Sequence, residues 1–235
     1  MTAPRLILSA VLAFGLASCG TPQGGGAPGP RPASAQQAER QQSQQILAEL
    51  QQKNMLIKGD RVNTYVDEIT ARIDSARPRN ASRLRTYIVK DASANAFTSG
   101  AGYVFIHAGL LATMENEAQL AMVLAHEIAH EDLGHVSAGM AQRQNVAIGQ
   151  MLAGIGGAIL GVPGELTNLV AGIGGQAIYA DFSRDQESAA DDLGMKYLVE
   201  AGYDGVAGAK SFQVMRRMYG DDTNFLSTHP GTTDR

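Results

Sequence analysis

The stretch His126-Glu127-Ile128-Ala129-His130 decides how the rest of this 235-residue chain is interpreted. Apolar residues around it recur as in an amphipathic helix, at Leu120, Val123, Leu124 and Ile128. A helix places the two histidines one turn apart and about 40° apart around its axis, so both imidazoles can reach one metal ion. The alternative is a pair of core histidines satisfied by protein groups. Burying two histidines and a carboxylate among apolar neighbours is costly without a ligand, which favours a metal site.

The motif helix is expected to extend from near Asn116 to about Gln142. Asn116 is a good N-cap, and Gln119 three residues later would complete a capping box. His135 lies nine residues after His126, about 180° around a continuing helix. We therefore expect His135 to be structural or at the surface rather than a ligand of the same ion.

The motif helix supplies two ligands, and a third must come from elsewhere in the chain. The elongated motif of the metzincins has a third histidine and a turning glycine at positions where this chain has Val136 and Leu133. Downstream, Glu187 and Asp191 stand four residues apart and share one face of an expected helix. One of them can ligate a metal ion while the other orients a ligand imidazole. The alternative is a pair of solvated helix charges.

Short strands and further helices complete the expected fold. Residues 84–89 and 103–107 show β-type patterns on either side of the turn-rich segment 99–102, and two adjacent antiparallel strands are the simplest interpretation. Helical periodicity marks residues 36–52 and a second helix that begins at Asp60. The predicted class is α+β, a mainly helical domain with a small antiparallel sheet beside the motif helix.

The first nineteen residues have the layout of an export signal. Arg5 precedes an apolar run at residues 6–16, and small residues lead to Cys19, the single cysteine of the sequence. The ending Leu16-Ala17-Ser18-Cys19 resembles the bacterial lipobox, in which the cysteine becomes the lipid-bearing N-terminus. An ordinary cleaved signal or a short buried helix is the alternative. Gly20 stands where retention in the inner membrane usually uses Asp, which favours the outer membrane.

Three segments follow from this pattern. We expect a lipoprotein signal peptide at residues 1–18, a flexible Gly/Pro-rich tether at 19–36 and one folded domain at 37–235. The Gly-rich stretch 144–180 is either a lid beside the cleft or a membrane hairpin, and its short, partly polar second half favours the lid. The lone cysteine excludes a disulfide framework, and a net charge of −4 without charge runs argues against nucleic acid as a partner.

On these residues the chain resembles the metallopeptidase family that includes the CAAX prenyl endopeptidases, HtpX and the periplasmic lipoprotein proteases of the BepA type. The likeness covers about residues 46–235. It includes the motif helix and several landmarks, at residues 95–97, 102–111, 184–194, 201–204 and 227–230. The resemblance implies a compact zincin-like fold with the small sheet beside the motif helix.

The resemblance also implies a catalytic metal site. One zinc ion per chain would be held by His126, His130 and Glu187, leaving an open position for water. Glu127 would be the general base that activates this water. Asp191 would orient a ligand imidazole without touching the metal.

Further residues receive roles from the same resemblance. The edge strand near Asn95 and Ala96 would pair with an extended substrate backbone. His229 and Arg235 would stabilise the oxyanion of the transition state, or His229 would instead occupy the open zinc position and hold the enzyme inactive. A loop histidine without a catalytic role is the remaining interpretation of His229, and Arg235 is the last residue of the sequence. His107, at a strand end, is expected to be structural.

The expected function is that of a zinc-dependent endopeptidase acting on misfolded or stalled cell-envelope proteins. Its partners would be extended or unfolded polypeptides, the membrane through an N-terminal lipid, and the outer-membrane assembly machinery, but not nucleic acid. The expected location is the bacterial cell envelope, lipid-anchored at the outer membrane and facing the periplasm. Two alternatives are a non-proteolytic periplasmic chaperone or assembly adaptor that keeps the fold, and an integral inner-membrane protease of the HtpX type.

Cys19→Ala is expected to abolish lipid attachment, because the variant lacks the thiol that would carry the acyl chains. Bacterial cells that express either form are labelled with radioactive palmitate, and the purified proteins are compared. The unmodified sequence should carry label and the variant should carry none. An unlabelled parent protein would refute the lipid anchor.

Overall fold

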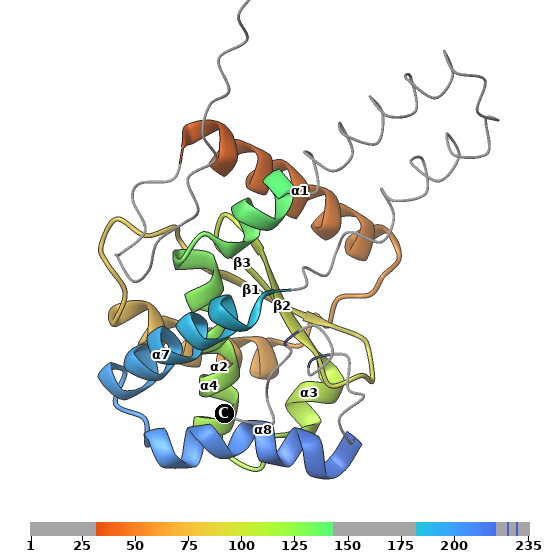
Figure 1. Cartoon of the computed structure of the whole chain (residues 1–235). Helices are drawn as coiled ribbons and strands as arrows, with labels where there is room; N and C mark the ends of the chain where they lie inside the picture. The colour runs from red at the N-terminus through yellow and green to blue at the C-terminus, as the bar shows by residue number, and fades with distance from the viewer. Residues whose placement is uncertain (1–31, 143–181, 220–224, 226–228, 230–235) are drawn as a thin grey trace, which may run out of the picture.

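The computed structural model describes residues 32–142 and 182–219, together with Phe225 and His229 (Figure 1). Its helices surround a small sheet. The elements follow in this order: α1 (Ala33–Gln52), α2 (Asp60–Ser75), β1 (Arg85–Val89), β2 (Ala96–Gly100), β3 (Tyr103–His107), α3 (Ala108–Thr113), α4 (Glu117–Asp132), α7 (Arg184–Glu200) and α8 (Gly205–Tyr219). Because α1 begins at Ala33, the last four residues of the predicted tether, 33–36, are helical.

Several expectations lie outside the described residues. These are the signal peptide at 1–18, the tether up to residue 31 with Cys19, the Gly-rich stretch 144–180 and Arg235. Within the described part, none of the helices combines the length and the apolar character needed to cross a membrane.

The sheet is mixed, with the strand order β1-β3-β2. β1 runs parallel to β3 and β2 runs antiparallel to it. The prediction that residues 84–89 and 103–107 form antiparallel neighbours was therefore wrong in direction, although the two strands are adjacent. The reason is β2, which lies between them in sequence and reverses the chain once before a hairpin reverses it again. This hairpin turns at residues 100–102, which all have positive φ.

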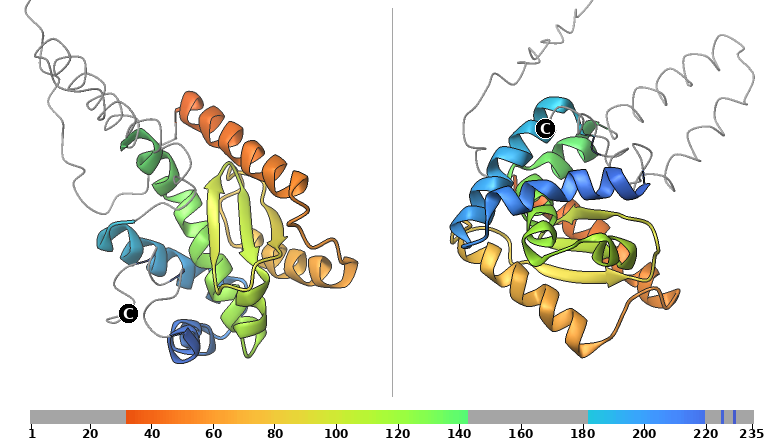
Figure 2. Two further views of the ribbon diagram at one scale, coloured as in Figure 1. Left: turned by 90° about the vertical axis from the view of Figure 1, so that its right-hand side faces the viewer. Right: turned by 90° about the horizontal axis from the view of Figure 1, so that it is seen from below.

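The two faces of the sheet pack against different helices. Val104 and Ile106 of β3 belong to the main core, together with residues of α2, α4, α7 and α8. Tyr103 and Phe105 alternate with them along the strand and pack with Ile46 of α1. Figure 2 shows α1 on one side of the sheet and α4 on the other. The sheet is thus a middle layer, and the motif helix lies on the face opposite α1.

Helix α4 carries the motif and lies in the centre of the domain. Residues 119–131 are all buried, so the helix is covered on every side. The prediction of an amphipathic helix was therefore wrong. It contacts β2, α2, α7 and α8, which together leave it no solvent-facing stripe. The predicted N-cap is confirmed, because the Asn116 side chain accepts a hydrogen bond from the Gln119 N–H. The capping box is not closed, since the Gln119 side chain accepts from the Glu115 N–H instead.

The motif helix was predicted to extend to about Gln142, but α4 ends at Asp132. A positive φ of 72° at Gly134 turns the chain, and helical residues resume at His135. Glycine is favoured at such a helix end because it adopts the left-handed conformation without a Cβ clash. The break changes where His135 lies relative to the motif.

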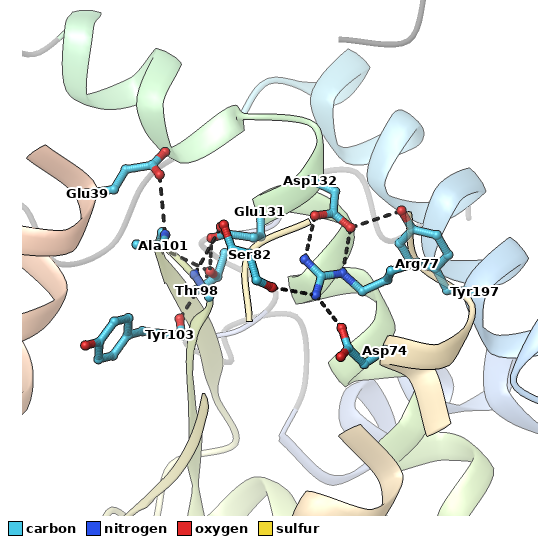
Figure 3. Close-up of polar contacts among 12 residues, drawn as sticks. Glu39, Asp74, Arg77, Ser82, Thr98, Ala101, Tyr103, Glu131, Asp132 and Tyr197 are labelled. Carbon is cyan, nitrogen blue, oxygen red and sulfur yellow. Dashed lines mark hydrogen bonds and ion pairs between the residues drawn. The ribbon is translucent and has the colours of Figure 1, made fainter. Parts of the chain in front are cut away.

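A buried ion pair fixes this end of α4. The Arg77 guanidinium donates to both carboxylate oxygens of Asp132, at 2.8 and 2.6 Å, and to Asp74 at 2.6 Å (Figure 3). The Tyr197 hydroxyl donates to Asp132 at 3.0 Å. A buried charge is tolerated when its hydrogen bonds are made, and here they tie α2, α4 and α7 together.

Candidate metal centre

Four potential ligands come together from separate elements. Helix α4 supplies His126 and His130, α7 supplies Glu187, and His229 follows α8; we call these four side chains the donor cluster. All four are buried, and their ligand atoms lie within 4.8 Å of one another. The two helices approach closely at Gly194, where a Cβ atom would lie 3.0 Å from the backbone nitrogen of His126.

Four of the six distances among the ligand atoms of the donor cluster are close to the edge of a zinc tetrahedron. His126 Nε2 lies 3.1 Å from His130 Nε2 and 3.3 Å from His229 Nδ1. Glu187 Oε1 lies 3.3 Å from His130 Nε2 and 2.9 Å from His229 Nδ1. Ligand atoms around zinc are about 3.3 Å apart, because a tetrahedron with metal–nitrogen distances of about 2.0 to 2.1 Å has edges of that length. The donor set therefore suits one zinc ion.

The outward nitrogens of the two motif histidines also have partners. His126 Nδ1 lies 3.0 Å from Asp191 Oδ1, and His130 Nδ1 lies 2.9 Å from His135 Nδ1. Metal-ligating histidines usually engage their second nitrogen in this way. The expected position of His135, about 180° from His126, assumed a continuous helix, and the turn at Gly134 removes that assumption. The glycine itself was the signal that could have indicated the break.

Glu127 lies beside the donor cluster and is anchored to the sheet. Its Oε2 accepts a hydrogen bond from the Thr98 N–H at 3.0 Å, and its Oε1 lies 3.4 Å from His229 Nε2. Burial raises the pKa of Glu127 to about 7. A carboxyl with a pKa near neutrality both accepts and returns a proton readily at pH 7. Thr98 was missed because helix and strand meet here across 29 residues of sequence.

The protonation states of the donor cluster suit metal ligation. Burial alone would raise the pKa of Glu187, but hydrogen bonds from His130 and His229 hold it below its usual range. Burial lowers the pKa of His126 and His130, and lowers that of His135 to about 4. The Glu187 carboxylate is therefore charged and the imidazoles of His126 and His130 are neutral, which are the forms that bind a metal ion.

Aromatic rings enclose the donor cluster. Phe182 stacks on the His130 ring, with ring centroids 3.9 Å apart and an interplanar angle of 23°. Phe225 stacks on His229 with centroids 4.4 Å apart. Both phenylalanines are buried and help to exclude water from the site. They flank α7 and α8 in sequence, so helical periodicity gave no indication of their role.

A second glutamate of α4 holds the hairpin next to the site. Glu131 accepts hydrogen bonds from the Gly102 N–H at 3.1 Å and from the Thr98 hydroxyl at 3.3 Å (Figure 3). On the other side of the hairpin, Glu39 of α1 accepts from the Ala101 N–H at 3.3 Å. Glu131 thus fixes the hairpin against α4, where β2 bonds the motif glutamate, and Glu39 fixes it against α1.

The edge strand β2 presents only some of its backbone to the outside of the sheet. The Asn95 carbonyl accepts from the His107 N–H of β3, and hydrogen-bonded pairs alternate with non-bonded pairs along an antiparallel ladder. The main-chain groups of Ala96 and Thr98 therefore point to the outer edge, whereas the Asn95 carbonyl faces β3. The Asn95 side-chain amide is fully buried and has no hydrogen-bond partner among the described residues.

His107, expected to be structural, is buried at the end of β3 and is not part of the donor cluster. Its Nδ1 lies 2.8 Å from the Ser93 hydroxyl. Ser93 donates in turn to Asp91 at 2.7 Å, so the serine proton is not presented to the histidine. The trio therefore does not form an activated nucleophile.

Two helix histidines, a glutamate from a second helix and a glutamate beside them define the class of zinc metallopeptidases with the His-Glu-x-x-His motif. The profile of peptidase family M48 matches residues 59–235, and the chain belongs to this family. The family resemblance, the α+β class and the zinc cofactor predicted from the sequence are thereby confirmed, with the donor cluster as the group able to bind the metal.

Several curated proteins are similar to the chain. The putative beta-barrel assembly-enhancing protease of Vibrio cholerae is 30% identical over 74% of this chain and 37% of its own length. The mitochondrial metalloendopeptidase OMA1 of Schizosaccharomyces pombe is 29% identical over 73% of this chain and 50% of its own length. The metalloprotease LoiP of Escherichia coli is 30% identical over 64% of this chain and 58% of its own length. The chain thus spans about a third to a little over half of these relatives.

Gly194→Ala is expected to weaken zinc binding roughly tenfold or more, which is the usual cost of displacing a ligand's support. The added methyl group would lie 3.0 to 3.2 Å from backbone atoms of α4, so α7 must move away and take Glu187 with it. Zinc affinity is measured by competition with a chromophoric chelator. Gly205→Ala is the control, since its Cβ meets only the side chains of Met195 and Val199. Parent-like affinity in Gly194→Ala would contradict the packing argument.

Proposed function

We propose that this protein is a zinc-dependent endopeptidase in which His126, His130 and Glu187 hold the metal and Glu127 is the general base. The observation that carries the proposal is the convergence of buried donors at tetrahedral spacing next to the Glu127 carboxylate. Two imidazoles and one carboxylate form the ligand set of many zinc peptidases, which keep a fourth position for catalysis. Burying these groups together without a ligand would be costly.

The geometry supports a mechanism based on proton transfer by Glu127. When bound, zinc would supply a Lewis acid that acidifies a water molecule and polarises the peptide carbonyl. Glu127 Oε1 faces the donor cluster and takes the proton of the attacking water, while the Thr98 N–H holds Oε2 in place. Glu127 then returns the proton to the leaving amine. Asp191 orients the His126 imidazole through Nδ1.

The substrate in this proposal is an extended polypeptide that adds to the outer edge of β2. Ala96 supplies a main-chain donor and acceptor at this edge. The unpaired amide of Asn95 supplies a further polar group at the start of the strand. The Thr98 N–H is already engaged by Glu127, so the pairing region ends there.

His229 has two predicted roles, and its position supports the inhibitory one. Its Nδ1 lies among the ligand atoms, 2.9 Å from Glu187 Oε1 and 3.3 Å from His126 Nε2. A zinc ion with four protein ligands has no open position for water or substrate. In this proposal the enzyme is therefore inactive until His229 moves aside.

We place the enzyme in the bacterial cell envelope, anchored by lipid at Cys19 to the outer membrane and facing the periplasm. The lipobox-like sequence supports the anchor. The similarity to proteins named beta-barrel assembly-enhancing protease supports misfolded or stalled envelope proteins as substrates and a link with outer-membrane assembly.

Glu127→Gln is expected to lower the rate of casein or self-cleavage by about 10² to 10⁴, because the amide cannot accept the proton of the water. Zinc content should stay at one ion per chain, since the ligands are unchanged. Glu117→Gln, a change to an exposed carboxylate of the same helix, is the matched control and should retain activity. A chelator should abolish the parent's activity and added zinc should restore it. Because His229 would hold the parent inactive, the comparison is repeated with His229→Ala added to both proteins; zinc bound with equal, negligible turnover in all four proteins would contradict the protease and favour the chaperone or adaptor.

His229→Ala tests the inhibitory position of this histidine. The variant should bind zinc more weakly than the parent, because one donor is lost, and should cleave casein faster, because the fourth position is open. Turnover and zinc affinity are measured on the same preparations. A loss of turnover similar to that of Glu127→Gln would instead assign His229 to the transition state.

A further inference from the structure

His135 lies directly behind one of the two motif histidines. Its Nδ1 is 2.9 Å from His130 Nδ1, and the two ring centroids are 5.0 Å apart. On a continuous helix, five residues would separate the two side chains by about 140° around the axis. The end of α4 at Asp132 and the positive φ at Gly134 bring His135 back to the motif. The contact therefore depends on the break in the helix at Gly134.

The nitrogen that His130 offers to the metal determines where His130 and His135 carry their protons. His130 presents Nε2 to the donor cluster, 3.1 Å from His126 Nε2 and 3.3 Å from Glu187 Oε1. A nitrogen that binds a metal ion carries no proton, so a neutral His130 carries its proton on Nδ1. This N–H then donates to His135 Nδ1, which must be the unprotonated nitrogen of its own ring. His135 accordingly carries its proton on Nε2.

The hydrogen bond between His130 and His135 selects one orientation of the His130 ring, which ring stacking alone does not do. Phe182 lies parallel to the His130 ring and restrains its tilt. Stacking does not distinguish this ring from one turned by 180° about the Cβ–Cγ bond, in which a carbon atom replaces Nε2 at the donor cluster. The turned ring would also present a carbon to His135 and lose the hydrogen bond. The acceptor at His135 therefore selects the orientation that offers nitrogen to the metal.

We propose that His135 is a positioning residue for zinc binding, which fixes the tautomer and ring orientation of His130 through its Nδ1 lone pair. The inference rests on the proposed role of His130 as a ligand. The two motif histidines would then be oriented by different partners: the carboxylate of Asp191 contacts His126, and the imidazole of His135 contacts His130.

Three substitutions at His135 test both the residue and the specific role of its Nδ1 atom. Asn places its carbonyl oxygen at the distance of Nδ1 along the side chain, Gln places its carbonyl oxygen near the position of Nε2, and Leu offers no acceptor. Zinc affinity by chelator competition should fall about 10- to 100-fold in His135→Leu and His135→Gln, the usual effect of losing such a partner. His135→Asn should stay close to the parent. The melting temperature of the metal-free protein should be alike for the Asn and Gln variants.

Controls separate this inference from the proposed function. His107→Asn changes a buried histidine outside the donor cluster and should leave zinc affinity unchanged. Failure of the parent to bind zinc would refute the metal site itself. Tight binding by the parent together with parent-like binding by the Leu and Gln variants would overturn the role of His135 alone. So would equal losses in the Asn and Gln variants, or losses that track the stability of the metal-free protein.

Discussion

The site depends on how closely α4 and α7 pack. Burial removes the polar ligands from water, and each unpaired polar group in such surroundings costs several kcal/mol, on the order of 2 to 7. Only a close approach of the two helices brings Glu187 to His130, and His229, which follows α8, completes its partners. The missing side chain at Gly194 permits this approach, because the α7 backbone lies against the backbone of His126. A wider spacing would leave the carboxylate and the imidazoles buried apart, without the partners that compensate for their lost water.

Much of the domain was predictable because the information is local. The helical period alone placed His126 and His130 on one face, and the N-cap at Asn116 was confirmed. The helix beginning at Asp60 and the positions of two strands were also read from local patterns. Glu187 came from the family resemblance, since a carboxylate pair four residues apart is common on solvated helices.

The remaining features depend on contacts between distant parts of the chain. Strand β2 has a sequence rich in small residues, and it is a strand because β3 pairs with it. Arg77, 55 residues earlier, holds the Asp132 carboxylate at the end of α4, and the helical period does not reveal this contact, although Gly134 was a local signal of the break. Thr98, which supports Glu127, was missed because it belongs to another layer of the fold. His135 was missed because it reaches His130 only after the turn at Gly134.

Helix α1 has a consequence for the order of events during synthesis. Its buried polar side chains bond to residues far ahead in the chain: Ser43 to Ser99, 56 residues later, and Glu39 to Ser137, 98 residues later. In proteins most of the stability of a helix comes from tertiary packing, so α1 gains its stability from these partners and the sheet. At about 5 to 20 residues per second, the ribosome needs about 5 to 20 s to supply them. Among the described helices, the first to be made is thus among the last to be stabilised by its partners.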